Sequence, residues 1–167
     1  MRLTTKKITL MAMLTALLVT MQYVLAPFPN IKPLTAILML LVLFLGRTEA
    51  VVVSILTILL NGLLNGFGIW ILGQIIGYVV ILYLFSWLSR LSQSTLIQSI
   101  FVTLLPFLYG LINTIFMLGL FGHQTFIALW LAGLPFDGVH ALSTLCFFIL
   151  LKPIFQKLPF FQGNSIQ

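Results

Sequence analysis

Asp137 and His140 are the two residues of this chain best able to do chemistry together. They are three positions apart, so on a helix they share one face, and a carboxyl group beside an imidazole is a common basis for proton transfer. No nucleophile or metal cluster completes a catalytic set around them, and no enzyme activity is therefore expected. Binding of a ligand near Asp137 fits the sequence better, because a carboxylate is costly in so apolar a chain.

Further hydrogen-bonding side chains recur in pairs. Each pair is four positions apart and so occupies one face of a helix. The pairs are Asn61 with Asn65, Gln74 with Tyr78, and Tyr109 with Asn113. Amides at this spacing either contact a ligand or hold membrane helices together, and both interpretations stand for Gln74 and Asn113.

The composition places these residues in a membrane. Hydrophobic residues make up 61% of the 167 positions and charged residues only 6%, whereas about a quarter of a soluble domain is charged. The net charge of +6 comes from basic residues scattered beside apolar runs, so membrane topology explains it and no nucleic-acid partner is expected. The single cysteine, Cys146, excludes an internal disulfide and a cysteine metal site, and neither a metal nor another cofactor is expected.

Six apolar segments can be helices, given that a span needs about 20 apolar residues. We predict a single all-α membrane domain over residues 1–167, with helices at 8–25, 33–45, 49–64, 70–88, 96–120 and 135–157. The first segment imitates a signal peptide, but everything after it is equally apolar, so a retained helix is expected. The second is short for a span and is expected to be tilted or sunk among the others. Gly133 and Pro135 predict that the last helix begins only at 135.

Charge predicts the orientation of these helices. Six spans put both chain ends on one side together with seven of the eight basic residues, and leave only Lys32 on the other side. Basic residues concentrate on the cytoplasmic side of membrane proteins, so both termini are expected in the cytoplasm of a bacterial cell, with the chain in its plasma membrane.

On this map the strong hydrogen-bonding side chains lie in the outer halves of the spans. Asn30 and Lys32 fall in the outer loop after the first helix, and Trp70 and Trp130 add aromatic walls. The inner halves are almost wholly aliphatic or phenylalanine. A channel would be polar throughout, and an ion pump usually has carboxylates near the midplane. The pattern therefore predicts a cup that opens outward and binds a small organic ligand.

Structural interpretations stand beside the binding hypothesis. Asp137 could cap the last helix, because acidic side chains favour helix N-termini, and His140 could simply pair with it. Tyr78 and Trp70 could belong to an interfacial aromatic belt. Glu49, the second acidic residue, fits capping of the third helix at the cytoplasmic edge.

The first helix carries a stripe of small residues. Ala12 and Ala16 are four positions apart, and Thr9 and Thr20 lie nearby on the same face. Such a face allows another helix to approach closely. The partner is either another protein or the chain's own helices.

With these features the chain resembles the S components of energy-coupling-factor (ECF) transporters, the small six-helix vitamin-binding proteins of bacterial ABC-type importers. The resemblance covers the size and topology of the whole chain, and Ala12-x-x-x-Ala16 matches the motif with which those proteins dock. The stretch GLPFDGVH at 133–140, the later Lys152-Pro153 and the loop at 61–70 resemble one group that includes cobalamin-type members. Thr144 stands where that group has asparagine, which leaves the vitamin open.

The resemblance implies a mechanism and partners. The S component binds its vitamin from outside under a lid formed by the loop after helix 1, and docks through Ala12 and Ala16 on a transmembrane T component. Two cytoplasmic ATPase subunits drive uptake, and this chain itself has no Walker A loop. Cobalamin is the first candidate, followed by riboflavin, pantothenate and a queuosine precursor.

Two other classes of membrane protein compete with this reading. A structural subunit of the cell-wall elongation machinery, similar to rod-shape protein D, needs no ligand pocket. A stand-alone secondary transporter would move its substrate without an ATPase, although many such proteins show an internal repeat, which we do not find here.

The charge pattern makes a prediction about topology. In a Cys146→Ser background, Asn30→Cys should react with an impermeant thiol reagent added to intact cells, and Arg90→Cys should be spared, because basic residues stay inside. The opposite labelling pattern would reject the proposed orientation.

Overall fold

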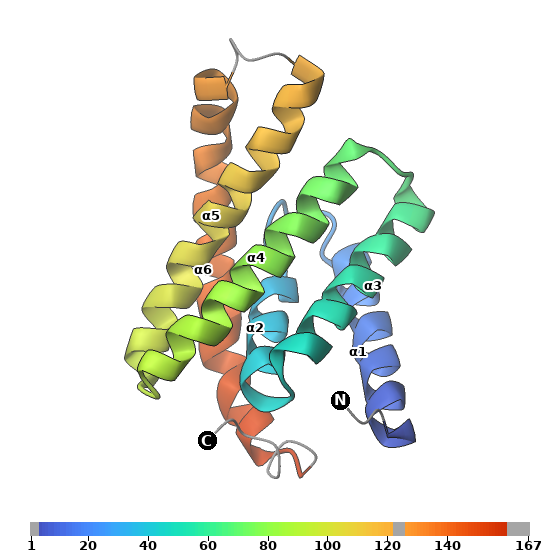
Figure 1. Cartoon of the computed structure of the whole chain (residues 1–167), viewed down its shortest axis with the longest axis vertical. Helices are drawn as coiled ribbons and strands as arrows, with labels where there is room; N and C mark the ends of the chain where they lie inside the picture. Colours follow the sequence, from blue (N-terminus) through green and yellow to red (C-terminus); the bar gives the residue numbers. More distant parts are fainter. Residues whose placement is uncertain (1–3, 122–125, 160–167) are drawn as a thin grey trace.

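The computed structural model describes residues 4–121 and 126–159, and in these ranges the regular structure is entirely α-helical. The helices alternate in direction, so α1 begins and α6 ends at the same end of the bundle (Figure 1). We name this the basic end, because Lys7, Arg47, Arg90 and Lys152 lie there, and the opposite end the open end. The bounds are α1 Thr5–Val24, α2 Leu34–Phe44, α3 Arg47–Asn65, α4 Ile69–Leu91, α5 Thr95–Phe121 and α6 Phe126–Lys157.

Five of these helices are long and apolar enough to cross a membrane. The prediction of an all-α membrane protein is thereby confirmed at the level of architecture. The exception is α2, whose 11 residues span about 16 Å, roughly half of a hydrocarbon core of about 30 Å.

The short helix α2 is the centre of the bundle. Ten of its 11 residues are buried, and it contacts all of the other helices. A helix that is apolar on every side must be surrounded by protein or lipid, and here the protein surrounds it. The expectation that this segment is sunk among the others is confirmed.

The turn after α2 fixes the basic end of the bundle. Gly46 adopts a φ of +124°, which a residue with a side chain rarely takes, so the chain reverses directly from α2 into α3. Glu49 follows in the first turn of α3, as expected of an acidic residue near a helix N-terminus. Its carboxylate also pairs with Lys7 at 2.5 Å, which ties α1 to α3.

The prediction that the last helix begins at 135 is wrong. The described helix α6 begins at Phe126 and runs for 32 residues, with Pro135 in its interior. In lipid the backbone has no water to bond, so a helix continues through a proline more readily than in a soluble protein. The α5–α6 hairpin consequently reaches beyond the α3–α4 turn at the open end (Figure 1). All other boundaries lie within three residues of the prediction.

Candidate functional site

A polar cavity lies in the open half of the bundle, above the N-terminus of α2. Its volume is about 150 Å³, and all six helices and the loop at 25–33 contribute to its wall. The structure brings eight of the twelve predicted ligand residues to this wall. They are Asn30, Lys32, Asn61, Gln74, Tyr78, Tyr109, Asp137 and His140.

Two further hollows adjoin this cavity and extend it toward the surface. One of about 310 Å³ includes Asn65 and Trp70, and one of about 200 Å³ includes Tyr23 and Asn65. Gln22 of α1 and Asn61 of α3 line all three hollows, so they are parts of one cleft.

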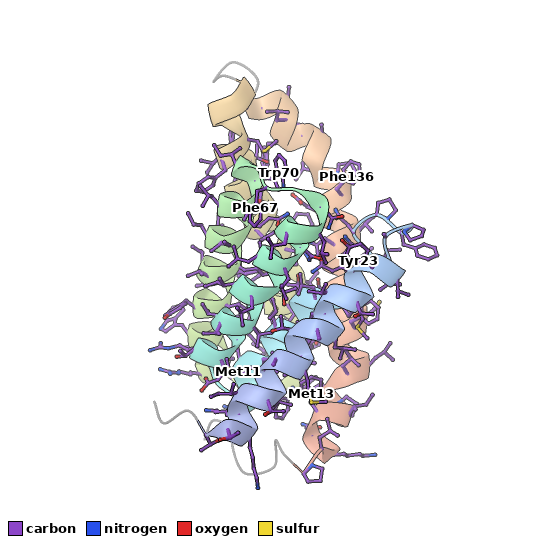
Figure 2. The ribbon with its side chains drawn as sticks, turned by 90° about the vertical axis from the view of Figure 1, so that its right-hand side faces the viewer. Met11, Met13, Tyr23, Phe67, Trp70 and Phe136 are labelled. Carbon is purple, nitrogen blue, oxygen red and sulfur yellow. The ribbon has the colours of Figure 1, made fainter. Side chains whose placement is uncertain are left out.

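Four exposed aromatic side chains lie in the open half. Tyr23, Phe67, Trp70 and Phe136 come from α1, the α3–α4 connection, α4 and α6, and they lie in the upper half of the molecule (Figure 2). Aromatic side chains are typical of the membrane–water interface, so this position fits an opening at the membrane surface.

The floor of the cavity is a hydrogen-bonded cluster centred on Thr35 of α2. Its hydroxyl oxygen lies 3.0 Å from the Tyr78 hydroxyl and 2.7 Å from Nε2 of His140. The Tyr109 ring packs on Tyr78 at a centroid distance of 4.6 Å and meets His140 edge-on at 5.6 Å. Three aromatic rings and one hydroxyl therefore close the bottom of the cup.

Asp137 neither caps α6 nor pairs with His140, the two structural roles considered for it from the sequence. It lies well inside α6, so it does not cap the helix, and the described partner of His140 is Thr35 rather than Asp137. Within residues 4–121 and 126–159 no hydrogen bond reaches the Asp137 carboxylate, which packs against Gly110 of α5. A side chain at position 110 would collide with this carboxylate. The carboxylate thus has unused acceptor capacity at the wall of the cavity.

The loop between α1 and α2 is pinned to α6 beside the cavity. Asn30 adopts a left-handed φ of +58°, and its Nδ2 donates to the Phe136 carbonyl at 3.0 Å. The Ser143 hydroxyl accepts from the Lys32 backbone N–H at 3.0 Å and donates to the Lys32 carbonyl at 3.3 Å. This anchoring holds the side chains of Asn30 and Lys32 at the cavity wall.

Two of the predicted residues lie outside this cleft. Asn113 sits between α4 and α5, where a Cβ on Gly73 or Gly77 would come within 3.1 or 3.3 Å of its amide atoms. Its Nδ2 donates to the Tyr109 carbonyl at 2.9 Å, so its described contacts are those of helix packing. Trp130 belongs to α6 and is absent from the walls of the three hollows.

Two polar residues of the first cavity were missed by sequence reasoning, besides the apolar Leu34 and Ile58. Gln22 is the only amide side chain of α1, and its buried Nε2 has no hydrogen-bond partner among the residues that the structure describes. Thr35 is the only hydrogen-bonding side chain of α2. Each was visible as a solitary polar residue within an apolar helix. Whether these two side chains line a cavity depends on which helices pack beside them, and the sequence does not show this.

Ala12 and Ala16 lie on the outside of the bundle. Both are exposed, whereas Met11, Thr15 and Leu18 form the buried side of α1. Met11 and Met13 point to different sides of the helix (Figure 2). The small-residue face therefore does not pack against the chain's own described helices and is free to meet another helix.

In comparisons with known proteins, no family model, no curated protein and no solved structure matches this chain. The described residues also contain no group of three or more His, Cys, Asp or Glu side chains that could hold a metal ion.

The Thr35 cluster makes a prediction about stability. Thr35→Val keeps the shape of the side chain but leaves Tyr78 and His140 without their shared partner, so the free energy of unfolding should fall by about 1–3 kcal/mol. Thr103→Val is the matched control, because the one hydrogen bond described for that hydroxyl goes to the Ser99 carbonyl of its own helix. Denaturant or thermal unfolding in detergent would measure both, and an equal loss would contradict a special role for Thr35.

Proposed function

We propose that this chain is the membrane-embedded, substrate-binding S component of an ECF-type vitamin importer, and that it captures its vitamin from outside the cell. The observation that carries the proposal is the polar cleft of the open half, closed below by the buried helix α2. The proposal has three parts, which concern the direction of access, the ligand and the partner.

Access is from the open end alone. Below Thr35 the centre of the bundle is filled by fully buried apolar side chains, including Leu38, Ile81 and Phe85. Such a packed core leaves no polar path for a solute. A ligand that enters the cup cannot leave on the other side unless the whole subunit moves, which supports a binding subunit that depends on partners rather than a channel.

The ligand is a compact polar molecule with a flat ring. Pockets for drug-sized ligands have volumes of about 300–1,000 Å³, and the three joined hollows together fall near the middle of this range. Tyr109 and His140 offer aromatic surfaces, while Asn61, Gln74 and Asp137 offer amides and a carboxylate. Riboflavin or a queuosine precursor fits this description better than the much larger cobalamin.

The partner is the T component, which docks on the Ala12–Ala16 face of α1. Three of the 20 residues of α1 are buried, so most of this helix remains available to a second protein or to lipid. Small side chains let two helix backbones approach closely. Energy for uptake would come from two cytoplasmic ATPase subunits bound to that partner.

Ligand binding gives the first test of this function. Mass spectrometry of the purified protein should identify a co-purifying small molecule, and titration should give its Kd. Asp137→Ala and Asn61→Ala should each weaken binding by about 10- to 100-fold, because a lost hydrogen bond in the cleft costs about 1–3 kcal/mol. Asn113→Ala is the control, since its amide lies between α4 and α5, and it should bind normally. Unchanged Kd values for Asp137→Ala and Asn61→Ala would reject the cleft as the ligand site.

Docking gives a separate test. Replacing both Ala12 and Ala16 with leucine should abolish uptake and leave the Kd of the isolated protein unchanged, because the bulky side chains prevent close approach of the partner helix. Met13→Leu, on the exposed side of the same helix, controls for a general change of surface. Uptake that persists in cells lacking the ATPase subunits would instead favour a secondary transporter.

A further inference from the structure

A second polar hollow lies at the basic end, on the far side of α2 from the cleft. Its volume is about 190 Å³, and it is enclosed by the end of α2, the end of α4, the start of α5 and the last turns of α6. The side chains that give it its chemical character are Arg90, Thr95, Gln98 and Lys152. None of these residues belongs to the proposed vitamin site.

Lys152 is a buried cation whose partners among the described residues are all neutral. It is 7% exposed, and its Nζ donates to Thr95 Oγ1 and to Gln98 Oε1, both at 2.8 Å. The Phe148 ring lies 5.5 Å below the same nitrogen. An ammonium group has three hydrogens, so one donor remains for a further acceptor in the hollow.

Arg90 adds a second positive charge to the same hollow. It is exposed, and within the described part of the chain it forms neither an ion pair nor a hydrogen bond. Its guanidinium group offers five donors in a planar fork that suits a phosphate group. The first turn of α5 also begins at Thr95, and the free N–H groups of a helix N-terminus favour an anion.

The chain has no acidic side chain with which to balance these charges. It contains two such residues in all, of which Glu49 pairs with Lys7 and Asp137 lies at the cleft in the other half of the bundle. Two cations that face one hollow repel each other, and burial raises the energy of the Lys152 charge, so an anion bound between the two side chains would stabilise both. With Glu49 and Asp137 both located elsewhere, a counter-ion for this hollow would not be an acidic side chain of this protein.

We propose that this hollow binds the phosphate group of an anionic phospholipid. Basic pockets between helices at the cytoplasmic side of a membrane are suited to phospholipid headgroups, and the hollow lies at the end of the bundle that the charge pattern predicts to be cytoplasmic. The proposal does not depend on the vitamin-binding function, because it rests on other residues at the opposite end of the bundle.

An apolar groove between the same two helices, α5 and α6, favours a lipid over a free phosphate ion. It has a volume of about 400 Å³ and is lined by α5 and α6, including Leu96, Ile100, Leu145 and Ile149. Leu96 follows Thr95 in the chain and Ile149 lies one turn before Lys152, so the groove and the hollow both involve the start of α5 and the last turns of α6, although no residue lines both. A phosphate in the hollow and an acyl chain in the groove would belong to one molecule.

Native mass spectrometry of the full-length protein in detergent tests this proposal. Titration with dioleoylphosphatidylglycerol should give a one-to-one adduct, and dioleoylphosphatidylcholine, which has the same chains and no net charge, should bind at least about tenfold more weakly. Arg90→Gln should weaken the phosphatidylglycerol adduct by about tenfold or more, the loss expected of one charge-assisted hydrogen bond. Lys6→Gln is the matched control, because it removes one positive charge from an exposed position at the same end. It should bind phosphatidylglycerol as the unmodified protein does.

The remaining outcomes would overturn the proposal. Equal weakening by Arg90→Gln and Lys6→Gln would mean general attraction to a basic surface. Displacement of the lipid by an equal concentration of inorganic phosphate would mean a site for a free anion. Lys152→Gln adds a second measurement if it folds, and the Arg90 result stands without it because Arg90 is exposed.

Discussion

The burial of one short apolar helix is the constraint on which the rest of the structure depends. Because α2 is apolar on every side, the other helices must surround it, and because it has only 11 residues, it fills only part of the bundle's depth. The space beyond the N-terminus of α2 is the cleft, and Thr35 lies at its floor. The same helix provides part of the wall of the hollow at the basic end, through Leu43 and Phe44. A full-length span in this position would have filled the cup.

The scarcity of acidic residues shapes the two ends differently. Glu49 is engaged with Lys7, and this ion pair fastens α1 to α3 at the basic end. Asp137 has no such described partner and stands at the wall of the cleft. With both carboxylates assigned, the positive charges of Arg90 and Lys152 have no acidic side chain to meet. One end of the bundle is therefore suited to a polar solute, and the other to an anion from the membrane.

Helix α1 packs less extensively against the rest of the bundle than any other described helix does. Only three of its residues are buried, and its packing is mainly against α3. It contributes Gln22 to the cleft on its inner side and exposes Ala12 and Ala16 on its outer side. One helix therefore takes part in both the proposed capture of ligand and the proposed docking.

The sequence alone determined the membrane character, the number of helices and most of their boundaries, because lipid forces each apolar segment to satisfy its own backbone in a helix. It also determined the depth of the polar side chains, since helical spacing and alternating direction put Asn61, Gln74 and Tyr109 at one end. It could not determine that α6 runs through Pro135, because that depends on how the bundle and lipid surround the proline.

Only the tertiary structure decided which polar groups meet. The link from Thr35 to His140 spans 105 positions, and that from Lys152 to Gln98 spans 54. The position of Asn113 also depends on a contact between helices, because its side chain lies against Gly73 and Gly77 of α4 and outside the cleft. Hydropathy and periodicity fix how deep a side chain lies and which face of its helix it occupies. The neighbour it meets there depends on the packing of one helix against another, which no local pattern specifies.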